Sequence, residues 1–191
     1  MCDEKNKETP ECESGVNLKA EDYRDPWLAA GVNKAIGFFP REFYCLDNYS
    51  AFKIKYKGWV YATVEEAYQA SAFLEVADDV AEQIRQARSP YEAKQISVAN
   101  KDRKRPDWET KKLEVMEELL REKVKQHPYV REMLIKTQQN RIVEDSPKDT
   151  FWGWGPNRDG ENHMGRLWMK LREQVLNGEL YGHENQRCTG I

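Results

Sequence analysis

The chain has 191 residues, a formal net charge of −3 and 39% apolar residues, among them 6 Trp, 9 Tyr and 6 Phe. This length suits one domain with a well-filled core, and the charge argues against a general nucleic-acid binder, which needs a basic surface. The first residues are charged and no apolar run approaches the ~20 residues of a membrane span, so we expect neither a signal peptide nor a membrane protein.

The two ends of the chain have the composition of disordered segments. Residues 1–22 are rich in Glu, Lys, Asp and Ser and contain almost nothing to bury. Residues 177–191 have the same loose character. We therefore expect one folded domain over residues 23–176, between a disordered leader and a flexible tail.

Short strands are predicted early in this domain. Residues 36–39 form a short strand, and residues 51–56 alternate apolar and charged side chains with the period of a half-buried strand. Lys57-Gly58 then predicts a turn into a second strand at residues 59–61, which completes a hairpin.

Helical patterns dominate the rest of the chain. Thr63 and Glu66 have the spacing of a capping box, which predicts a helix start at Thr63. Further helices and one strand are expected at residues 79–88, 90–98, from 107 to a break at 127–128, 129–136, 141–144 (the strand) and 164–175. The expected fold class is α+β, a mainly helical single domain with a small antiparallel sheet.

A turn-rich loop at residues 144–155, just before the last helix, carries the strongest functional signal. It combines carboxylates with two indoles, and four glycines fall between residues 153 and 165. Glycines allow backbone amides to approach a ligand closely, and a following helix N-terminus favours an anion. Aromatic rings beside carboxylates suit a ligand with a flat base and a sugar that develops positive charge. The loop therefore predicts a site for a nucleotide or a ribosyl phosphate.

Glu65 is the first candidate for chemistry. It lies in the first turn of a helix that follows a strand, where the helix dipole favours an ionised carboxylate. The alternative is that Glu65 and Glu66 are both ordinary N-terminal helix charges. The capping-box spacing accounts for Glu66 but leaves Glu65 without a structural explanation.

Asp149 and Glu144 are the next candidates, because loop carboxylates flanked by aromatic residues are common at binding sites. Asp149 has a structural alternative as a turn-forming residue. We expect one of Trp152 and Trp154 to stack on a base and the other to fill the core. Glu144 lies at the end of the strand that leads into the loop.

Three further residues have both a binding and a structural interpretation. Arg105 is suited to bidentate phosphate binding but lies in a basic run, where a solvated arginine is common. Trp108 follows at the start of the long helix, and Asn162 either caps the last helix or holds a hydroxyl group. The four cysteines form no CxxC pair and the three histidines have no paired ligand spacing. We therefore expect a reducing, cytoplasmic location, no metal site and no cofactor.

These motifs occur in the order that is typical of one family. The chain resembles the NADAR (NAD- and ADP-ribose-associated), or YbiA-like, family over residues 36–175. The resemblance is carried by Leu46-Asp47-Asn48-Tyr49, residues 63–70, Ser89-Pro90, Arg105-x-Asp107-Trp108-Glu109, Val115-Met116, residues 143–153, and Asn162-x-x-Gly165-x-x-x-Met169-x-x-Arg172.

The resemblance implies an N-glycosidase that hydrolyses the bond between a ribose anomeric carbon and a nitrogen. It implies as substrates a phosphoribosyl-amino-pyrimidine of riboflavin biosynthesis or ADP-ribose attached to guanine, including ADP-ribosylated nucleic acid. Glu65 and Asp149 would then be catalytic, because a fixed carboxylate stabilises an oxocarbenium-like sugar and accepts a proton. The implied substrate-binding residues are Asn48, Gln69, Arg105, Trp108, Trp152, Gly153 and Asn162. No membrane and no obligate protein partner is implied.

Ala72 departs from the family pattern, in which a lysine is expected at this position. Such a lysine would supply a phosphate cation or form a Schiff base with a ring-opened ribose. The sequence leaves open whether this chain is slow, mechanistically different, inactive or an engineered variant. A non-catalytic module that binds ADP-ribose or NAD is therefore the alternative function, and a purely structural interaction domain is the third.

Overall fold

The structure is a computed structural model that describes residues 16–17, 34–38 and 42–180. Most of the predicted leader and most of the predicted tail lie outside the described residues. Within them, Val16–Asn17 forms a strand and residues 177–180 follow the last helix. The boundaries of the leader and the tail stay predictions.

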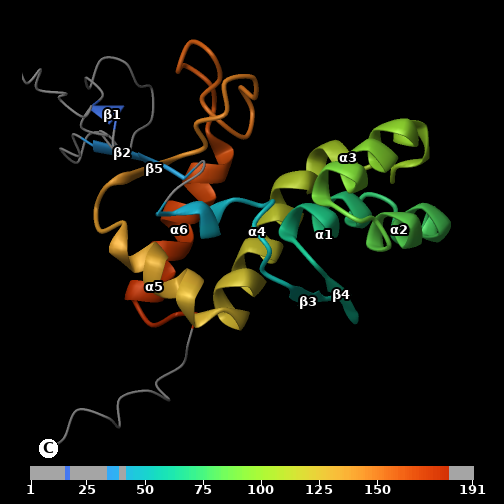
Figure 1. Cartoon of the computed structure of the whole chain (residues 1–191), viewed down its shortest axis with the longest axis horizontal. Coiled ribbons are helices and arrows are strands. Elements are labelled where there is room, and N and C mark those ends of the chain that lie inside the picture. Colours follow the sequence, from blue (N-terminus) through green and yellow to red (C-terminus); the bar gives the residue numbers. More distant parts are fainter. Residues whose placement is uncertain (1–15, 18–33, 39–41, 181–191) are drawn as a thin grey trace, which may run out of the picture.

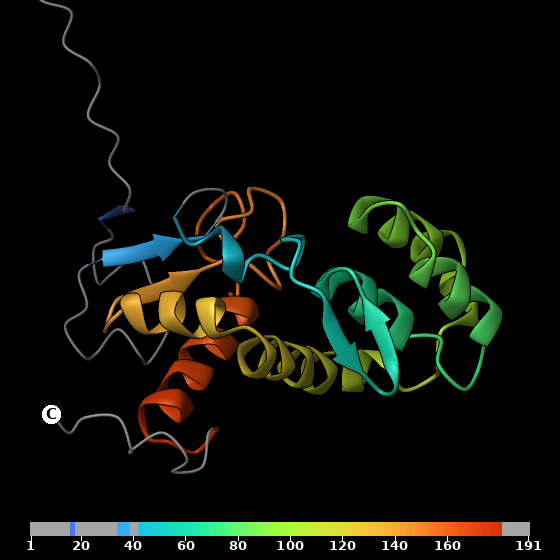
Figure 2. The same ribbon diagram turned by 60° about the horizontal axis from the view of Figure 1, so that its bottom comes forward.

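The long helix α4 (Trp108–Gln126) runs between two groups of elements (Figures 1 and 2). The first group contains α1 (Val64–Ser71), α2 (Asp78–Arg85), α3 (Pro90–Ala99) and the hairpin of β3 (Ile54–Tyr56) and β4 (Trp59–Tyr61). The second contains β1 (Val16–Asn17), β2 (Lys34–Gly37), β5 (Arg141–Val143), α5 (Pro128–Lys136) and α6 (His163–Leu176). Two 3-10 turns, η3 (Tyr44–Leu46) and η4 (Lys101–Arg103), complete the described elements. The mainly helical α+β class is confirmed.

The predicted hairpin is confirmed, with β3 antiparallel to β4. Its turn residues Lys57 and Gly58 have φ angles of 47° and 83°, the left-handed pair that a two-residue type I′ turn requires. A second sheet has the order β1-β2-β5, and its β2–β5 pair is parallel, with Ile36 opposite Ile142. The sequence predicted both strands but not this pairing of distant segments.

The predicted start of α1 is confirmed by its cap. The Thr63 side chain accepts a hydrogen bond from the Glu66 amide (3.2 Å), and the Glu66 carboxylate accepts one from the Ala62 amide (2.8 Å). This capping box explains why Glu66 is buried, and it begins α1 directly after the hairpin. Pro128 opens α5 after the break at His127, as predicted.

Lys123 of α4 is buried in the main core. Its ammonium group donates to the Asp47 carbonyl and to the Ser50 hydroxyl, both at 2.8 Å. Burial lowers the pKa of Lys123 to about 7. From the other side, the Trp168 indole donates to the Leu46 carbonyl (3.1 Å). Together these bonds hold the segment that carries Asn48 beside α1.

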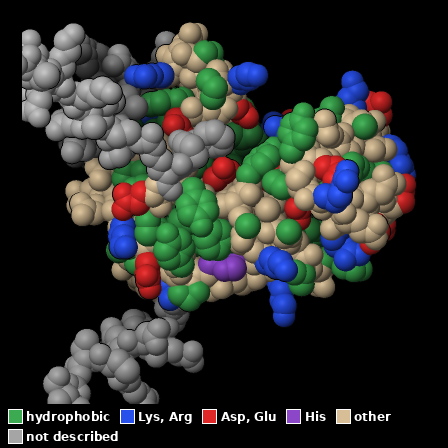
Figure 3. Space-filling view, in the orientation of Figure 1, with side chains coloured by type: hydrophobic (Ala, Val, Ile, Leu, Met, Phe, Trp, Pro, Cys, Tyr) green, Lys and Arg blue, Asp and Glu red, His purple; other side chains and the backbone are tan. Residues whose placement is uncertain are grey.

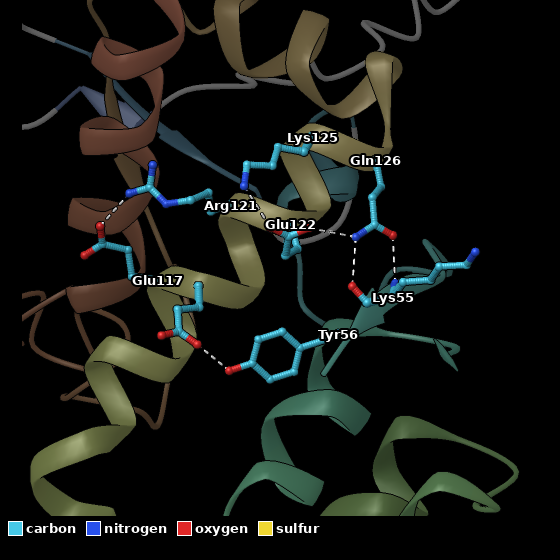
Figure 4. Close-up of polar contacts among 8 residues, drawn as sticks. Lys55, Tyr56, Glu117, Arg121, Glu122, Lys125 and Gln126 are labelled. Carbon is cyan, nitrogen blue, oxygen red and sulfur yellow. Dashed lines mark hydrogen bonds and ion pairs between the residues drawn. The ribbon is translucent and has the colours of Figure 1, made fainter. Parts of the chain in front are cut away.

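The hairpin is attached to α4 by a side chain that bonds the β3 backbone as a neighbouring strand would. In Figure 4 the amide of Gln126 faces the Lys55 backbone, accepting from its N–H (2.7 Å) and donating to its carbonyl (2.9 Å). The neighbouring Tyr56 hydroxyl donates to Glu118. These contacts fix the hairpin, and with it the start of α1, against the long helix.

One face of the molecule gathers hydrophobic side chains near α5 and the end of α4 (Figure 3). Phe52 stacks on the Tyr129 ring at 6.2 Å between centroids and lies at the same distance from the Tyr44 ring.

Among the described helices, none combines the length and the apolar character needed to cross a bilayer.

Candidate functional site

Helix α1 presents the side chains of Glu65, Tyr68 and Gln69 on one face, which we call the α1 stripe, and Ala72 follows on this face at the C-cap. The Gln69 amide donates to the Glu65 carboxylate (2.9 Å), and the Glu65 backbone N–H donates to the Asn48 carbonyl (3.1 Å). The Glu65 residue is only 6% exposed. Burial raises the pKa of Glu65, and bonds from Gln69 and Tyr49 and the charge of Lys94 oppose this shift. Glu65 is thus a buried carboxyl whose side chain is fixed by Gln69 and whose backbone is fixed by Asn48.

Five carboxyl groups from three segments lie close enough to interact, and we call them the acidic cluster. They are Asp47, Glu65, Glu144, Asp145 and Asp149. Burial, followed by repulsion from the other four carboxylates, raises the pKa of Glu144 to about 8. Glu144 therefore keeps its proton at neutral pH. The cluster can both stabilise a positive charge and donate a proton.

The loop after β5 is built around Asp149 and Gly153. One Asp149 oxygen accepts the amides of Phe151 (2.9 Å) and Trp152 (2.8 Å), so this residue does form a turn. A Cβ added to Gly153 would collide with the Glu144 carbonyl oxygen. Only glycine allows the loop to fold back this closely against Glu144.

An aromatic row extends from the acidic cluster, formed by Trp108, Tyr68, Trp152 and Phe151. The successive ring centroids are 5.0, 5.6 and 5.0 Å apart. Burial raises the pKa of the Tyr68 hydroxyl, and the charge of Glu65 adds to this shift. Trp154 instead packs with Ala35 and Val143 in a second small core. The expectation that one loop indole fills the core is confirmed, and stacking by Trp152 stays a prediction.

Asn48 offers an unused acceptor beside Glu65. Its amide nitrogen donates to the Met116 sulfur (3.5 Å), whereas its oxygen is buried and has no hydrogen-bond partner among the described residues. A buried polar oxygen without a partner is costly unless a water or ligand satisfies it. This atom can accept a hydrogen bond that no described residue supplies.

Two of the expected binding residues have structural partners. The Arg105 guanidinium pairs with Asp107 (2.6 Å), while its backbone N–H donates to the Ala72 carbonyl (2.8 Å). The Asn162 side chain is fully buried, accepts the Glu144 amide (2.9 Å) and donates to the Ile142 carbonyl (3.0 Å). Arg105 is therefore ion-paired and not freely solvated, and Asn162 stands at the N-cap of α6 although its side chain makes no hydrogen bond to that helix. A ligand contact of either one stays a prediction.

Ala72 lies at the C-terminal end of α1, is fully buried, and continues the stripe of Glu65, Tyr68 and Gln69. The structure supplies a cation near Glu65 that sequence reasoning missed. Lys94 of α3, a helix that packs against α1, acts electrostatically on the Glu65 carboxyl. It lies 29 positions from Glu65, so no local pattern could have revealed it.

Tyr49 is the other residue near Glu65 that sequence reasoning did not select. Its hydroxyl is hydrogen-bonded to the Glu65 carboxyl. Its neighbour Asn48 was selected, and the resemblance motif of residues 46–49 was the signal that could have identified Tyr49 as well. Among the described residues, no group of three or more His, Cys, Asp or Glu is arranged to hold a metal ion.

Comparison with known proteins gives the same assignment from two directions. The NADAR domain model matches residues 37–176. The chain is 37% identical over 134 residues to N-glycosidase Npun_R5314 of Nostoc punctiforme, covering 70% of this chain and 86% of that protein. It is 37% identical over 129 residues to N-glycosidase YbiA of Escherichia coli K12, covering 68% and 79%.

Two further matches extend the comparison. The chain is 37% identical over 126 residues to the chloroplastic riboflavin biosynthesis protein PYRR of Zea mays, covering 62% of this chain and 20% of that longer protein. The NMR structure of E. coli YbiA superposes with a TM-score of 0.70 at 32% identity, covering 80% of this chain and 90% of that one. The chain belongs to the NADAR domain family.

Proposed function

We propose that this glycosyl hydrolase of the NADAR family cleaves the ribose–nitrogen bond of a ribosylated base. The substrate would be ADP-ribosyl-guanine, free or in nucleic acid, or a phosphoribosyl-amino-pyrimidine. The observation that carries this proposal is the buried Glu65 carboxyl at the junction of the acidic cluster and the aromatic row. The similarity to proteins named N-glycosidase and to PYRR supports the reaction class and the riboflavin-type substrate.

In the proposed mechanism, cleavage leaves positive charge on the ribose ring, and the Glu65 carboxylate, whose ionised form Gln69, Tyr49 and Lys94 favour against burial, stabilises this charge. Glu144, which holds a proton at neutral pH, donates it to the departing base nitrogen. A water molecule forms the new bond to the anomeric carbon, and its proton returns to the acidic cluster. Asp149 is the partner carboxylate in this cluster, and the amides that it binds orient Trp152.

Binding in this proposal uses the groups that remain available to a ligand. The free Asn48 oxygen accepts a ribose hydroxyl, Trp152 and Trp108 frame the sugar or the base, and Gly153 gives the ligand access to the loop backbone. Gln69 orients Glu65, and Asn162 holds the Glu144 backbone. We propose a cytoplasmic location, in keeping with the cysteine pattern of the chain.

Ala72 favours a second candidate, a module that binds ADP-ribose or NAD without cleaving it. Without the lysine expected at this position, the α1 stripe contains no cation of its own. In this alternative the aromatic row and the Asn48 oxygen serve recognition only.

Incubation with ADP-ribosylated guanosine and with a phosphoribosyl-amino-pyrimidine, followed by chromatography, tests the proposal. Release of the free base from either substrate, lost in Glu65→Gln, supports the hydrolase. Tight binding without release supports the module instead. If neither substrate binds or is cleaved at millimolar concentration, the assignment is wrong.

A further inference from the structure

We propose that Lys104 and Lys112 form an anion subsite that binds a phosphate group of the substrate, at the opposite end of the aromatic row from Glu65. The proposal rests on the proposed function, because it adds to that site the group that recognises a ribosyl phosphate or a ribosyl diphosphate. It also replaces Arg105 as the main phosphate cation.

The first observation is the place of Lys112. Its ammonium nitrogen lies 3.9 Å from the centroid of the Phe151 ring, and Phe151 ends the aromatic row that passes through Trp152 to Tyr68. Lys112 is also one helical turn beyond Trp108 on α4, so both side chains share one helix face. A ligand that extends from the acidic cluster over the half-buried rings of Trp152 and Phe151 therefore reaches Lys112.

The second observation is that Lys104 shares the charge environment of Lys112. Burial lowers the pKa of Lys104, the charge of Glu109 opposes the shift, and the charge of Lys112 lowers it further. In the part of the chain that the structure describes, the Lys104 side chain has no hydrogen bond and no ion pair. Two neighbouring ammonium groups, one half-buried and unpaired, favour an anion between them.

Three of the neighbouring cations have carboxylate partners. Arg103 pairs with Asp79 (2.6 Å), Arg105 with Asp107 (2.6 Å), and Lys111 with Glu114 (2.7 Å). Lys112 pairs with Glu109 at 2.7 Å, but the Glu109 side chain is 79% exposed. An ion pair that is this exposed contributes little, so a phosphate dianion can displace Glu109 into solvent. Lys104 and Lys112 are therefore available to a ligand at the Phe151 end of the aromatic row.

The arrangement also matches the polarity of a ribosyl phosphate. Its anomeric carbon, where positive charge develops, would lie at the acidic cluster. Its phosphate would lie at the two lysines, with the rings of Tyr68, Trp152 and Phe151 between them and Glu65. A monophosphate and a diphosphate offer the same chemistry to the lysines and differ in reach, so binding measurements must separate them.

The test compares three double variants in the full chain. Lys104→Gln/Lys112→Gln removes both charges, and Lys104→Arg/Lys112→Arg keeps them. Lys111→Gln/Lys125→Gln is the matched control, because it removes two charges from exposed ion pairs on the same helix. Calorimetry measures dissociation constants for ribose 5-phosphate, ADP-ribose and adenosine, and thermal unfolding checks that each variant folds.

We expect the glutamine pair to weaken binding of ribose 5-phosphate or ADP-ribose by about tenfold to hundredfold, the effect of losing one or more hydrogen bonds to a charged group. The stronger effect identifies the monophosphate or the diphosphate as the ligand. Adenosine binding should be unchanged, the arginine pair should stay within a few-fold of wild type, and the control should match wild type. Equal losses in the control, or equal losses for adenosine, would overturn the subsite.

The base-release assay on the same variants separates this proposal from the proposed function. If the wild type binds phosphorylated ligands with the expected pattern but releases no base, the subsite stands and the glycosidase assignment fails. If base is released from a phosphorylated substrate with the same KM in the wild type and the glutamine pair, the glycosidase stands and the subsite fails.

Discussion

The acidic cluster and the lysine pair are held in place by different means. Glu65 is fixed by Gln69 and by its own backbone bond to Asn48, and Asp149 is fixed by two loop amides. The lysines extend on long side chains, and the one ion pair between them and the protein is exposed. Rigid carboxylates suit the end of the site where charge develops during a reaction, because preorganisation lowers the barrier. Ammonium groups on long side chains suit attraction of an anion, which needs less exact geometry.

The largest expected effect comes from removing the charge of Glu65 in the acidic cluster. Glu65→Gln should lower base release by about 10²–10³, as for loss of one preorganised electrostatic group, with little change in substrate affinity. Glu66→Gln is the matched control, because Glu66 accepts a backbone amide at the helix start and its glutamine keeps an acceptor. Steady-state kinetics on both variants checks this, and wild-type turnover by Glu65→Gln would remove Glu65 from the mechanism.

The next effect concerns the aromatic row, which lies between the acidic cluster and the lysine pair. Trp152→Ala should weaken ADP-ribose binding by about tenfold to hundredfold, because stacking on an aromatic ring contributes ~1–3 kcal/mol per base. It should also abolish quenching of tryptophan fluorescence by ADP-ribose. Trp59→Ala, on the exposed hairpin, is the control. Persistent quenching in Trp152→Ala would exclude Trp152 as the stacking residue.

A lysine at position 72 tests whether a cation on the Glu65 face of α1 raises turnover. Ala72→Lys is expected to raise turnover by about tenfold, equivalent to one hydrogen bond to a charged group. The gain should be larger in a Lys94→Gln background, where α3 no longer contributes its charge. Turnover and dissociation constants are measured on each form.

Ala72→Met is the control for this substitution, since it adds bulk to a fully buried position without charge. An equal gain in the methionine variant would assign the effect to packing. Unchanged turnover in a folded lysine variant would show that the reaction needs no cation at position 72.

The last expected effect is on stability and not on turnover or binding, and it depends on pH. The pKa of Glu144 is about 8 in the folded state and near 4.5 in the unfolded state, so the folded state holds an extra proton between these pH values. Stability therefore falls as pH rises from about 4.5 to about 8, by at most ~1.4 kcal/mol per pH unit from this group. Glu144→Gln should flatten the profile in thermal or urea unfolding, whereas exposed Glu132→Gln should not. A steeper profile in Glu144→Gln would contradict the pKa assignment.

Local patterns predicted the elements well. The hairpin turn at Lys57-Gly58, the capping box of Thr63 and the break at His127-Pro128 each depend on residues within four positions of one another. The parallel pairing of β2 with β5 depends on segments about 100 residues apart, and no local period encodes it.

The same distinction applies to the site. Glu65 and Asp149 were selected from local context, whereas Lys94 and the Lys104–Lys112 pair become visible only when helices pack. Asn162 was ambiguous from spacing, because a capping residue and a ligand contact are identical in sequence. The buried Lys123 was missed because its position on α4 places a charge among apolar neighbours, and only its bonds to the 47–50 segment explain it.

The bond from Trp168 to the Leu46 carbonyl has a consequence for the time course of folding. It joins residues 122 positions apart, and Lys123 reaches Asp47 across 76 positions. Contacts of such large sequence separation form late, because the intervening chain must be ordered before they can close. The segment that supports Glu65 is therefore completed only when α6 docks. During synthesis, ligand binding should begin only after the last helix has left the ribosome, however early the first helices form.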